Sequence, residues 1–382
     1  MRILFLNPGG DAAGGAERSL ALLIGGLAQR GHEPAVITLQ PGSAAGLFAS
    51  RGATVLAEGV GSGLGGVDRH AKALQLTRTM RKLGGDALAT ARSIAEIASR
   101  YRPDVVHSNG LRTHVLTPYL ARRHPVVWSL RERPAFGWGR RLVSTTARTT
   151  TAIAATSAFA AAGVSRCGRP VYIVPNPVEP SPPPSVEAAR RALDLPTDRS
   201  IVGVLAHLHP TKGHHDAVAA WALLEQPRPL LILAGGDLYG PVSASYRREL
   251  EAQIDERSLG RDVRLLGLVA DVSLLLAACD VVLHPAVYPE GFGRSVAEAQ
   301  TAGVPVIATG IGGVLELIED RRSGLVVPPS DPLRLAHAVT EVLGDDGLRR
   351  DLVLGGLDAA HRYAPAAHAA AFENVLRMAA AR

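Results

Sequence analysis

The chain of 382 residues contains little lysine, little cysteine and few aromatic residues, and it has no long apolar run. Its two cysteines, Cys167 and Cys279, lie far apart and form no metal-ligand or redox motif, so we expect buried thiols in a reducing compartment. No run reaches the roughly 18 apolar residues of a membrane-spanning helix. Any contact with a membrane is therefore expected to be peripheral.

Hydrophobic residues make up 47% of the chain, which is enough for aliphatic cores in two domains. The first apolar run, Ile3–Leu6, is too short for a signal peptide and is broken by Asn7-Pro8-Gly9-Gly10. We therefore expect this run to form a buried strand. We also expect the protein to be cytoplasmic, with room for a peripheral position at the inner face of the membrane.

Charge is unevenly distributed along the chain. Residues 1–180 carry 22 Lys and Arg against 10 Asp and Glu, a net charge of +12, whereas the remainder is net acidic. A basic half attracts an anionic ligand or an anionic membrane surface. No nucleic-acid-binding motif accompanies it, so nucleic acid is not an expected partner. The basic segment 131–141 with Phe136 and Trp138 suits a membrane-interface loop, an anion-binding loop or an ordinary surface loop.

Strand-like and helix-like stretches alternate along the first half of the chain, the pattern of a parallel, doubly wound α/β sheet. The expected strands are Ile3–Asn7, Ala35–Leu39, Thr54–Ala57, Val105–His107, Val126–Leu130, Ala152–Ala155 and Val171–Val174. The expected helices cover residues 16–30, residues 68–100 with an interruption at Gly84-Gly85, and residues 140–149.

Prolines crowd residues 175–184, where they disfavour helix and sheet and predict a linker. A second alternating series follows, with expected strands at Ser200–Leu205, Leu230–Ala234, Val263–Leu266, Val281–His284, Val304–Ala308 and Gly324–Val327. We predict two Rossmann-like domains, residues 1–178 and 179–360, followed by a helical stretch at 361–382. Ligands of such sheets bind at the carboxyl ends of the strands, so two facing domains would share one cleft.

Residues 290–298 are the most informative stretch for chemistry. Glu290 and Glu298 stand eight positions apart, a glycine turn follows the first, and a helical pattern begins near Arg294. The unpaired N–H groups and the dipole of a helix start hold anions. A carboxylate beside them accepts hydrogen bonds from sugar hydroxyls. The combination predicts a site for a phosphorylated and polyhydroxylated molecule, such as a sugar nucleotide.

This segment resembles the E-x7-E element of the retaining glycosyltransferases of family 4, which have the two-domain GT-B fold. The resemblance continues through residues 298–309, Gly312-Gly313, Glu316 and residues 323–328. It implies an acceptor-side first domain, a donor-binding second domain, and a last helix that crosses back to the first domain.

The resemblance also implies roles for the residues of this segment. Glu298 would hold the donor ribose, and Glu290 would hold sugar hydroxyls near the developing positive charge. The backbone N–H groups of Gly291, Phe292 and Gly293, together with Lys212, would stabilise the leaving diphosphate. Arg294, where the helix begins, would be a further donor-binding residue.

A second segment, residues 202–213, resembles the family's cationic loop. Family members commonly carry Arg and, five residues later, Lys, whereas this chain has His207 and Lys212. A histidine is only partly charged near neutral pH and lacks the two-pronged guanidinium. His209, His214 and His215 are near, but a zinc site from these histidines has no spacing signature. Gly235 begins a loop that resembles the family's Gly-x-Gly turn, beside the donor base and phosphates.

In the first domain the resemblance points to three residues. Gly14 and Gly15 match the loop whose backbone amides approach the donor diphosphate or the acceptor. His107 matches the first histidine of a His-x-His strand end that contacts the donor sugar, although Asn109 replaces the second. The plain alternatives, a strand-to-helix turn and a structural histidine, stay open.

The expected function is that of an enzyme, a retaining hexosyltransferase. It would move a sugar from a nucleotide sugar, with UDP as the expected nucleotide, to an unidentified hydroxyl acceptor. That acceptor can be a small molecule, a secondary metabolite or a lipid-linked saccharide. Lys212, Glu290 and His107 are the expected catalytic residues. No Asp-x-Asp motif is present, so we expect neither a metal ion nor a cofactor, the nucleotide sugar being a substrate.

Two alternatives come from other functional classes. A nucleotide-sugar 2-epimerase can have the same fold but needs acids in the first domain, where Glu17 and Asp104 are the main candidates. A non-catalytic nucleotide-sugar-binding subunit would explain the departure at position 207. The presence of Glu290, Glu298 and Lys212 favours an active enzyme over this second alternative.

Overall fold

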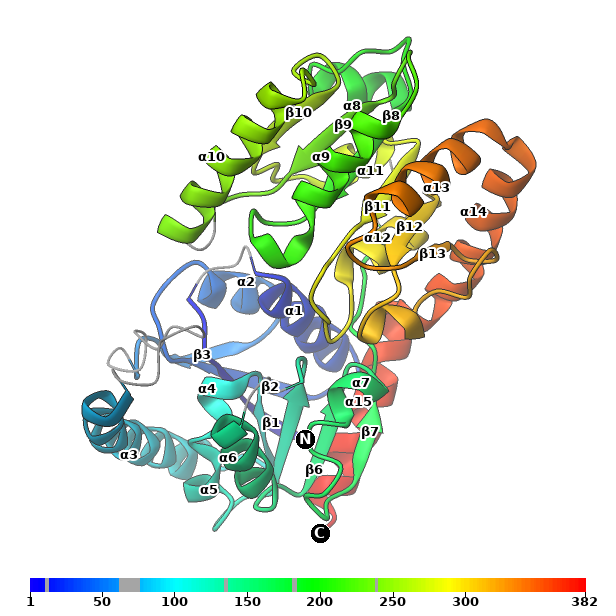
Figure 1. The fold of residues 1–382 in the computed structure, drawn as a ribbon. Coiled ribbons are helices and arrows are strands. Elements are labelled where there is room, and N and C mark those ends of the chain that lie inside the picture. The colour runs from blue at the N-terminus through cyan, green and yellow to red at the C-terminus, as the bar shows by residue number, and fades with distance from the viewer. Residues whose placement is uncertain (11–13, 62–75, 134–136, 181–183, 238–239) are drawn as a thin grey trace. The chain divides into compact units, whose positions relative to one another are not determined.

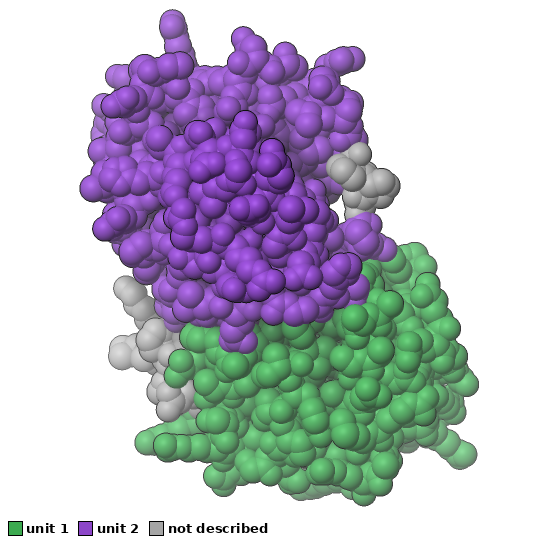
Figure 2. Space-filling model, turned by 90° about the vertical axis from the view of Figure 1, so that its right-hand side faces the viewer, with its two compact units in different colours: residues 1–177, 365–382 green, residues 178–364 purple. Residues whose placement is uncertain are grey.

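The computed structural model describes residues 1–10, 14–61, 76–133, 137–180, 184–237 and 240–382. The chain divides into two compact units, each built on one parallel sheet (Figures 1 and 2). Unit 1 comprises residues 1–177 and 365–382, and unit 2 comprises residues 178–364. Phe136 of the basic segment and residues 68–75 of the expected long helix lie outside the described residues.

Unit 1 contains a seven-stranded sheet in the order β3-β2-β1-β4-β5-β6-β7. Its strands are β1 (Arg2–Asn7), β2 (Glu33–Thr38), β3 (Thr54–Ala57), β4 (Val105–Ser108), β5 (Val126–Leu130), β6 (Ala152–Ala155) and β7 (Val171–Ile173). Its helices are α1 (Gly15–Gln29), α2 (Ala44–Ser50), α3 (Leu76–Tyr101), α4 (Leu111–His114), α5 (Thr117–Leu120), α6 (Gly137–Ala147), α7 (Ala158–Ala161) and α15 (Pro365–Ala380).

Both faces of the unit 1 sheet are buried, as the apolar character of β1 requires. Successive side chains of a strand point to opposite faces. Ile3 and Phe5 pack in one core with residues of α1 and α15, and Leu4 and Leu6 pack in another with residues of α3. Helix α15, red in Figure 1, therefore completes one face of a sheet whose strands lie at the other end of the sequence.

Unit 2 contains a six-stranded sheet in the order β10-β9-β8-β11-β12-β13. Its strands are β8 (Ile201–Leu205), β9 (Leu230–Ala234), β10 (Val263–Gly267), β11 (Val281–His284), β12 (Val306–Thr309) and β13 (Leu325–Val327). Its helices are α8 (Val186–Ala192), α9 (His214–Leu223), α10 (Pro241–Glu256), α11 (Val272–Ala278), α12 (Arg294–Thr301), α13 (Pro332–Gly344) and α14 (Asp346–Ala360), with 3-10 turns η3 (Pro210–Lys212), η4 (Gly313–Glu316) and η5 (His361–Tyr363). Two separate cores cover its two faces.

The sequence pattern predicted these elements closely. The strands at Val126–Leu130, Leu230–Ala234 and Val281–His284 have the expected bounds, and helix α12 begins at Arg294. One expectation was wrong, because α3 continues without a break through Gly84-Gly85. Each glycine costs a helix only about 1 kcal/mol relative to alanine, which is too little to end a helix of 26 residues.

None of the helices in the described ranges combines the length and the apolar character of a membrane span.

The chain passes between the units twice, after Pro177 and after Ala364. Within unit 2, the Val178 N–H donates to the Tyr363 carbonyl at 2.9 Å. Within unit 1, His368 Nδ1 lies 2.7 Å from the Pro175 carbonyl oxygen. In each unit, therefore, a hydrogen bond joins the two segments through which the chain enters and leaves that unit.

Candidate functional site

The loops that follow β8, β11 and β12 are joined at the carboxyl edge of the unit 2 sheet. The Val287 N–H donates to the Thr211 carbonyl at 3.0 Å, which joins the loops after β11 and β8. The Gly313 N–H donates to the Glu290 carbonyl at 2.7 Å, which joins the loops after β12 and β11. This is the edge where parallel α/β sheets bind ligands.

Lys212 and Glu290 form an ion pair at this edge, although they are far apart in sequence. Lys212 Nζ donates to Glu290 Oε1 at 2.6 Å, and the two side chains are only 18% and 22% exposed. Gly213 makes the approach of the loops possible, because its φ is +71° and an added Cβ would lie 1.8 Å from the Pro285 carbonyl oxygen. The structure thus brings two predicted catalytic residues into direct contact.

The Glu290 carboxyl has its pKa below the ordinary value. Burial raises this pKa, but the positive charge of Lys212 and the interaction with His284 lower it by more. The carboxylate is therefore ionised at neutral pH. An ammonium group has three donors and Glu290 takes one of them, so Lys212 can still donate to a phosphate oxygen.

Helix α12 begins directly after this pair, and Glu298 lies one turn inside it, as predicted. Gly293 is the N-cap residue, with φ of +86°. Arg294 Nε donates to Glu298 Oε1 at 2.7 Å, which orients the predicted ribose-binding carboxylate. Phe292 is only 4% exposed and its ring packs edge-on against Tyr363, with 5.8 Å between centroids. Phe292 therefore anchors the turn and offers only its backbone to a ligand.

His207 lies beside this pair but does not carry the charge of the arginine that it replaces. Burial, followed by the positive charge of Lys212, lowers the pKa of His207 to about 3. The imidazole is therefore neutral at neutral pH. The expectation of a partly charged group at this position is corrected, and Lys212 supplies the positive charge of this loop without help from His207.

The remaining residues of these loops hold the backbone in place. The Gly235 N–H donates to the Gly267 carbonyl at 2.8 Å at the end of β9. His209 Nδ1 lies 2.7 Å from Thr211 Oγ1, and His214 Nε2 lies 3.3 Å from the Ala206 carbonyl oxygen. Within the described ranges, no three His, Cys, Asp or Glu side chains are grouped so that they could hold a metal ion.

His284 and Ser295 belong to the site but were not predicted as site residues. His284 is the last residue of β11, and its Nε2 lies 3.6 Å from Glu290 Oε1. Its Nδ1 lies 2.9 Å from Ser295 Oγ in the first turn of α12. A histidine that ends an otherwise apolar strand, at the edge where ligands bind, was the sequence signal that could have identified it.

Gly14 and Gly15 lie at the start of the first helix of unit 1. Gly14 is the N-cap residue of α1 in extended backbone, and Gly15 is its first residue. Glu17 in the same turn is the acidic residue that the helix dipole favours there. The roles of Gly14 and Gly15 in donor binding stay predictions.

His107 is buried in the core of unit 1, and its contact with the donor sugar stays a prediction. Its side chain is 0% exposed, and Nε2 is 2.8 Å from Ser129 Oγ. The rings of Phe5 and Phe372 lie 5.0 and 5.2 Å from its ring. Burial, followed by the charge of Arg131, lowers its pKa well below the ordinary value, so it is a neutral core residue.

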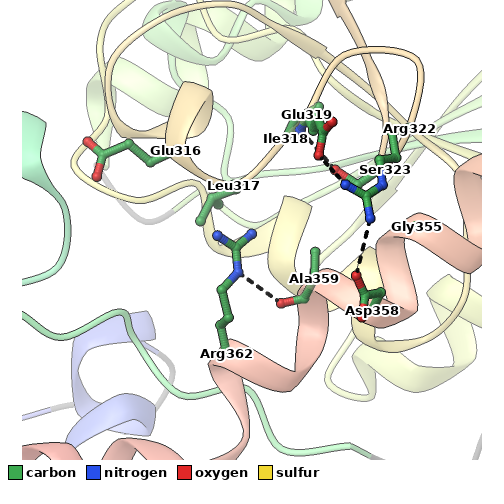
Figure 3. Close-up of a pocket in the computed structure, with 10 residues that line it drawn as sticks. All are labelled: Glu316, Leu317, Ile318, Glu319, Arg322, Ser323, Gly355, Asp358, Ala359 and Arg362. Atoms are coloured by element: carbon green, nitrogen blue, oxygen red, sulfur yellow. Dashed lines mark hydrogen bonds and ion pairs between the residues drawn. The ribbon is translucent and has the colours of Figure 1, made fainter.

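A pocket of about 410 Å³ lies on another part of unit 2 (Figure 3). In it, Arg322 bridges two carboxylates, at 2.8 Å from Glu319 and 3.8 Å from Asp358. All three side chains are more than half exposed, so these ion pairs contribute little to the stability of the fold. None of the predicted site residues, all of which are described, lines this pocket.

Two family models match the chain, one in each half. The model described as "Glycosyl transferases group 1" matches residues 185–356, and the model described as "Glycosyltransferase Family 4" matches residues 13–182. A D-inositol 3-phosphate glycosyltransferase of Corynebacterium urealyticum is 36% identical over 172 residues, 43% of this chain and 40% of the relative. A 2-deoxystreptamine glucosyltransferase of Streptomyces kanamyceticus is 30% identical over 231 residues, 58% of this chain and 56% of the relative. The chain thus spans about half the length of the curated relatives it matches.

Solved structures resemble the chain over its whole length. The Anabaena protein HepE in complex with UDP has a TM-score of 0.81 at 24% identity and covers 99% of this chain and 100% of its own. The sucrose-phosphate synthase of Thermosynechococcus elongatus has a TM-score of 0.79 at 21% identity, with 99% and 98% covered. At this identity the likeness concerns the fold. With both halves matched by family models and both sheets matched in structure, the chain belongs to glycosyltransferase family 4 and has the GT-B fold.

Proposed function

We propose that this protein is a retaining glycosyltransferase that moves a hexosyl-type sugar from a UDP-sugar to a hydroxyl group of its acceptor. The observation that carries the proposal is the Lys212–Glu290 ion pair beside the start of α12. A cation, an ionised carboxylate and the N-terminus of a helix are the groups that a sugar diphosphate needs.

In the proposed reaction, the bond between the anomeric carbon and the diphosphate oxygen breaks, and a bond to the acceptor oxygen forms on the same face of the sugar. The acceptor proton passes to an oxygen of the leaving diphosphate. Lys212 and the N–H groups at the start of α12 stabilise the charge on that diphosphate. Glu290 stabilises the positive charge on the sugar, and Glu298, oriented by Arg294, accepts hydrogen bonds from the ribose.

The first experiment is a calorimetric screen of UDP-, GDP- and ADP-sugars with the wild-type protein and the Glu298→Ala variant. One nucleotide should bind, and the variant should lose about tenfold or more in affinity, the value of a hydrogen bond to a charged group. The exposed Glu251 on α10 provides a matched control, and Glu251→Ala should bind like the wild type. If no nucleotide sugar binds to the wild type, the proposed donor site is wrong.

The second experiment identifies the reaction. The names of the relatives make D-inositol 3-phosphate and 2-deoxystreptamine the first acceptors to test. NMR spectra of the products would show a new glycosidic bond with the donor's anomeric configuration if the proposal holds. An altered configuration at C2 of the sugar, with no acceptor needed, would show a 2-epimerase instead. Binding without turnover under any of these conditions would indicate a non-catalytic subunit.

A further inference from the structure

The side chain of His284 has one nitrogen bonded and one without a hydrogen-bond partner. The residue is 4% exposed. Nδ1 lies 2.9 Å from Ser295 Oγ, whereas the buried Nε2 has no partner within hydrogen-bond distance. A buried polar atom without a partner is costly and rare in folded proteins, so it requires an explanation. Here the nearest charged group is Glu290, with Oε1 at 3.6 Å from Nε2.

The surroundings of His284 select one tautomer of the ring. Burial lowers its pKa by more than the nearby Glu290 raises it, so the imidazole is neutral and carries one proton. An ionised carboxylate only accepts hydrogen bonds. With the proton on Nδ1, the lone pair of Nε2 would face a negatively charged oxygen. With the proton on Nε2, the N–H faces that oxygen and Nδ1 accepts from the Ser295 hydroxyl.

The position of Glu290 between two donors matters when a ligand binds. Lys212 Nζ is the hydrogen-bond donor to Glu290 Oε1, at 2.6 Å. A bound diphosphate would compete for that ammonium group, because it carries more negative charge than a carboxylate. The Nε2–H of His284 is the second donor directed at the same oxygen, and a shift of less than 1 Å brings it into hydrogen-bond range.

We propose that His284 is a positioning residue for Glu290: the negative charge of Glu290 favours the proton on Nε2, Ser295 donates to Nδ1 of that tautomer, and the Nε2–H holds the carboxylate in place when Lys212 turns to the phosphate of the donor. The inference rests on the proposed function, since it assigns a role within the same site. His284 does not touch the reacting atoms and acts through Glu290.

Two substitutions test the roles of the two ring nitrogens separately. In His284→Asn, the side-chain amide reaches the position of Nδ1 and keeps the contact with Ser295, but nothing reaches Glu290. In His284→Gln, the longer side chain places an N–H donor near the position of Nε2. The control is His337→Gln, an exposed histidine of α13 in the same unit.

The readout is UDP binding by calorimetry together with the rate of UDP release from UDP-glucose. We expect His284→Asn to bind UDP like the wild type and to lose about 10- to 100-fold in kcat with KM unchanged, the effect of a misplaced group. His284→Gln should recover most of this loss. Equal activity of the Asn and Gln variants, whether both high or both low, would overturn the proposal.

A measurement on the wild-type protein tests the tautomer without any substitution in the ring. Long-range ¹H–¹⁵N NMR of protein with ¹⁵N-labelled histidine distinguishes Nε2–H from Nδ1–H, and the signal is assigned by its shift in Ser295→Ala. We expect Nε2–H, and Nδ1–H would overturn the proposal even if the His284 variants failed to fold. If no nucleotide sugar binds to the wild type, the proposed function fails and the role of His284 fails with it, whereas Nδ1–H in a protein that binds a nucleotide sugar overturns the role of His284 alone.

Discussion

At the scale of single residues, the Lys212–Glu290 pair makes a prediction about pH. Lys212→Met removes the cation that lowers the pKa of Glu290 but leaves the burial that raises it, so this pKa rises. In the proposed reaction the ionised carboxylate is the active form, so the acidic limb of the pH–rate profile should move to higher pH. The rate of UDP release should also fall by about 10²- to 10³-fold, as for other losses of a charge-stabilising donor.

The control for this prediction is Lys212→Arg, which keeps the charge in nearly the same place. Its acidic limb should stay close to that of the wild type, although its rate falls because the guanidinium has a different shape. The measurement is kcat/KM between pH 4 and pH 8 for the three proteins. An acidic limb at the same pH in the Met variant would show that Lys212 does not set the charge of Glu290.

The sequence predicted part of this site at the residue scale. Lys212, Glu290 and Glu298 were proposed because their segments resemble the cationic loop and the E-x7-E element of the family. The structure brings Lys212 into contact with Glu290, and the roles of the three residues stay predictions. The burial of His107 was not predictable in this way. The ring of Phe372 packs against the ring of His107. Phe372 belongs to α15 and lies 265 positions later in the chain. His284 was not predicted because its contact with Ser295 joins two residues 11 positions apart, on a strand and on the helix that follows it.

At the scale of elements, the loops after β11 and β12 depend on one backbone conformation. Gly312 has φ of +67°, and an added Cβ would lie 2.5 Å from the Glu290 carbonyl oxygen. Gly312→Ala should therefore move Glu290 away from Lys212. We expect a loss of stability of about 1–3 kcal/mol, the usual cost of such backbone strain, together with a large loss of activity.

Thermal melts and UDP-glucose turnover would measure both effects. The matched control is Gly344→Ala at the end of α13, where an added Cβ meets no atom within 4 Å. That variant should be at least as stable as the wild type, because alanine favours a helix more than glycine does. A Gly312→Ala variant with normal stability and turnover would show that the two loops are not coupled.

A second prediction at this scale concerns the attachment of α15 to unit 1. Glu373 on α15 is 7% exposed at its side chain and pairs with Arg30, with His32 Nε2 at 3.0 Å and with Arg377 Nη2 at 2.7 Å. Hydrogen bonds from Arg30, Arg377 and His32 lower the pKa of Glu373 to about 2. A carboxyl with a lowered pKa stabilises the fold above its ordinary pKa of 4.5, and this contribution is lost as the pH falls toward 2.

Glu373→Gln should therefore destabilise the protein by about 1–2 kcal/mol at pH 7, at the low end for charged hydrogen bonds because Arg30 and Arg377 are half-exposed. The difference from the wild type should shrink when unfolding is measured at pH 3. The control is Glu319→Gln, whose side chain is 66% exposed and whose removal should change stability by less than about 0.5 kcal/mol. A difference that does not depend on pH would exclude this role of the Glu373 charge.

The elements themselves were the most predictable part of the fold. Buried parallel strands are short apolar runs between turns, and the chain repeats that pattern thirteen times in its described part. What the sequence does not contain is the order of the strands in each sheet. Strand β1 pairs with both β2 and β4, and β8 pairs with both β9 and β11. These crossovers decide which loops meet, and so they place Lys212 of one loop on Glu290 of another.

At the scale of the whole molecule, the two units differ in their chain segments, because unit 2 is formed by one segment and unit 1 by two. Unit 2 is continuous, has a core on each face of its sheet, and its ends are joined by the hydrogen bond from Val178 to Tyr363. Unit 1 is discontinuous, because Phe372, Val375 and Leu376 of α15 belong to the same core as the first strand. A fragment of residues 1–177 would therefore expose an apolar face of its sheet.

We expect a fragment of residues 178–364 to fold alone, with a cooperative melt, because no part of its cores comes from elsewhere in the described chain. Since Lys212, Glu290 and Glu298 all lie in this fragment, it should bind UDP, and calorimetry would compare its affinity with that of the full chain. Residues 1–177 should fold only when residues 365–382 are joined to them by a short linker. If the fragment of residues 178–364 folds but does not bind UDP, the donor site does not lie at the Lys212–Glu290 pair.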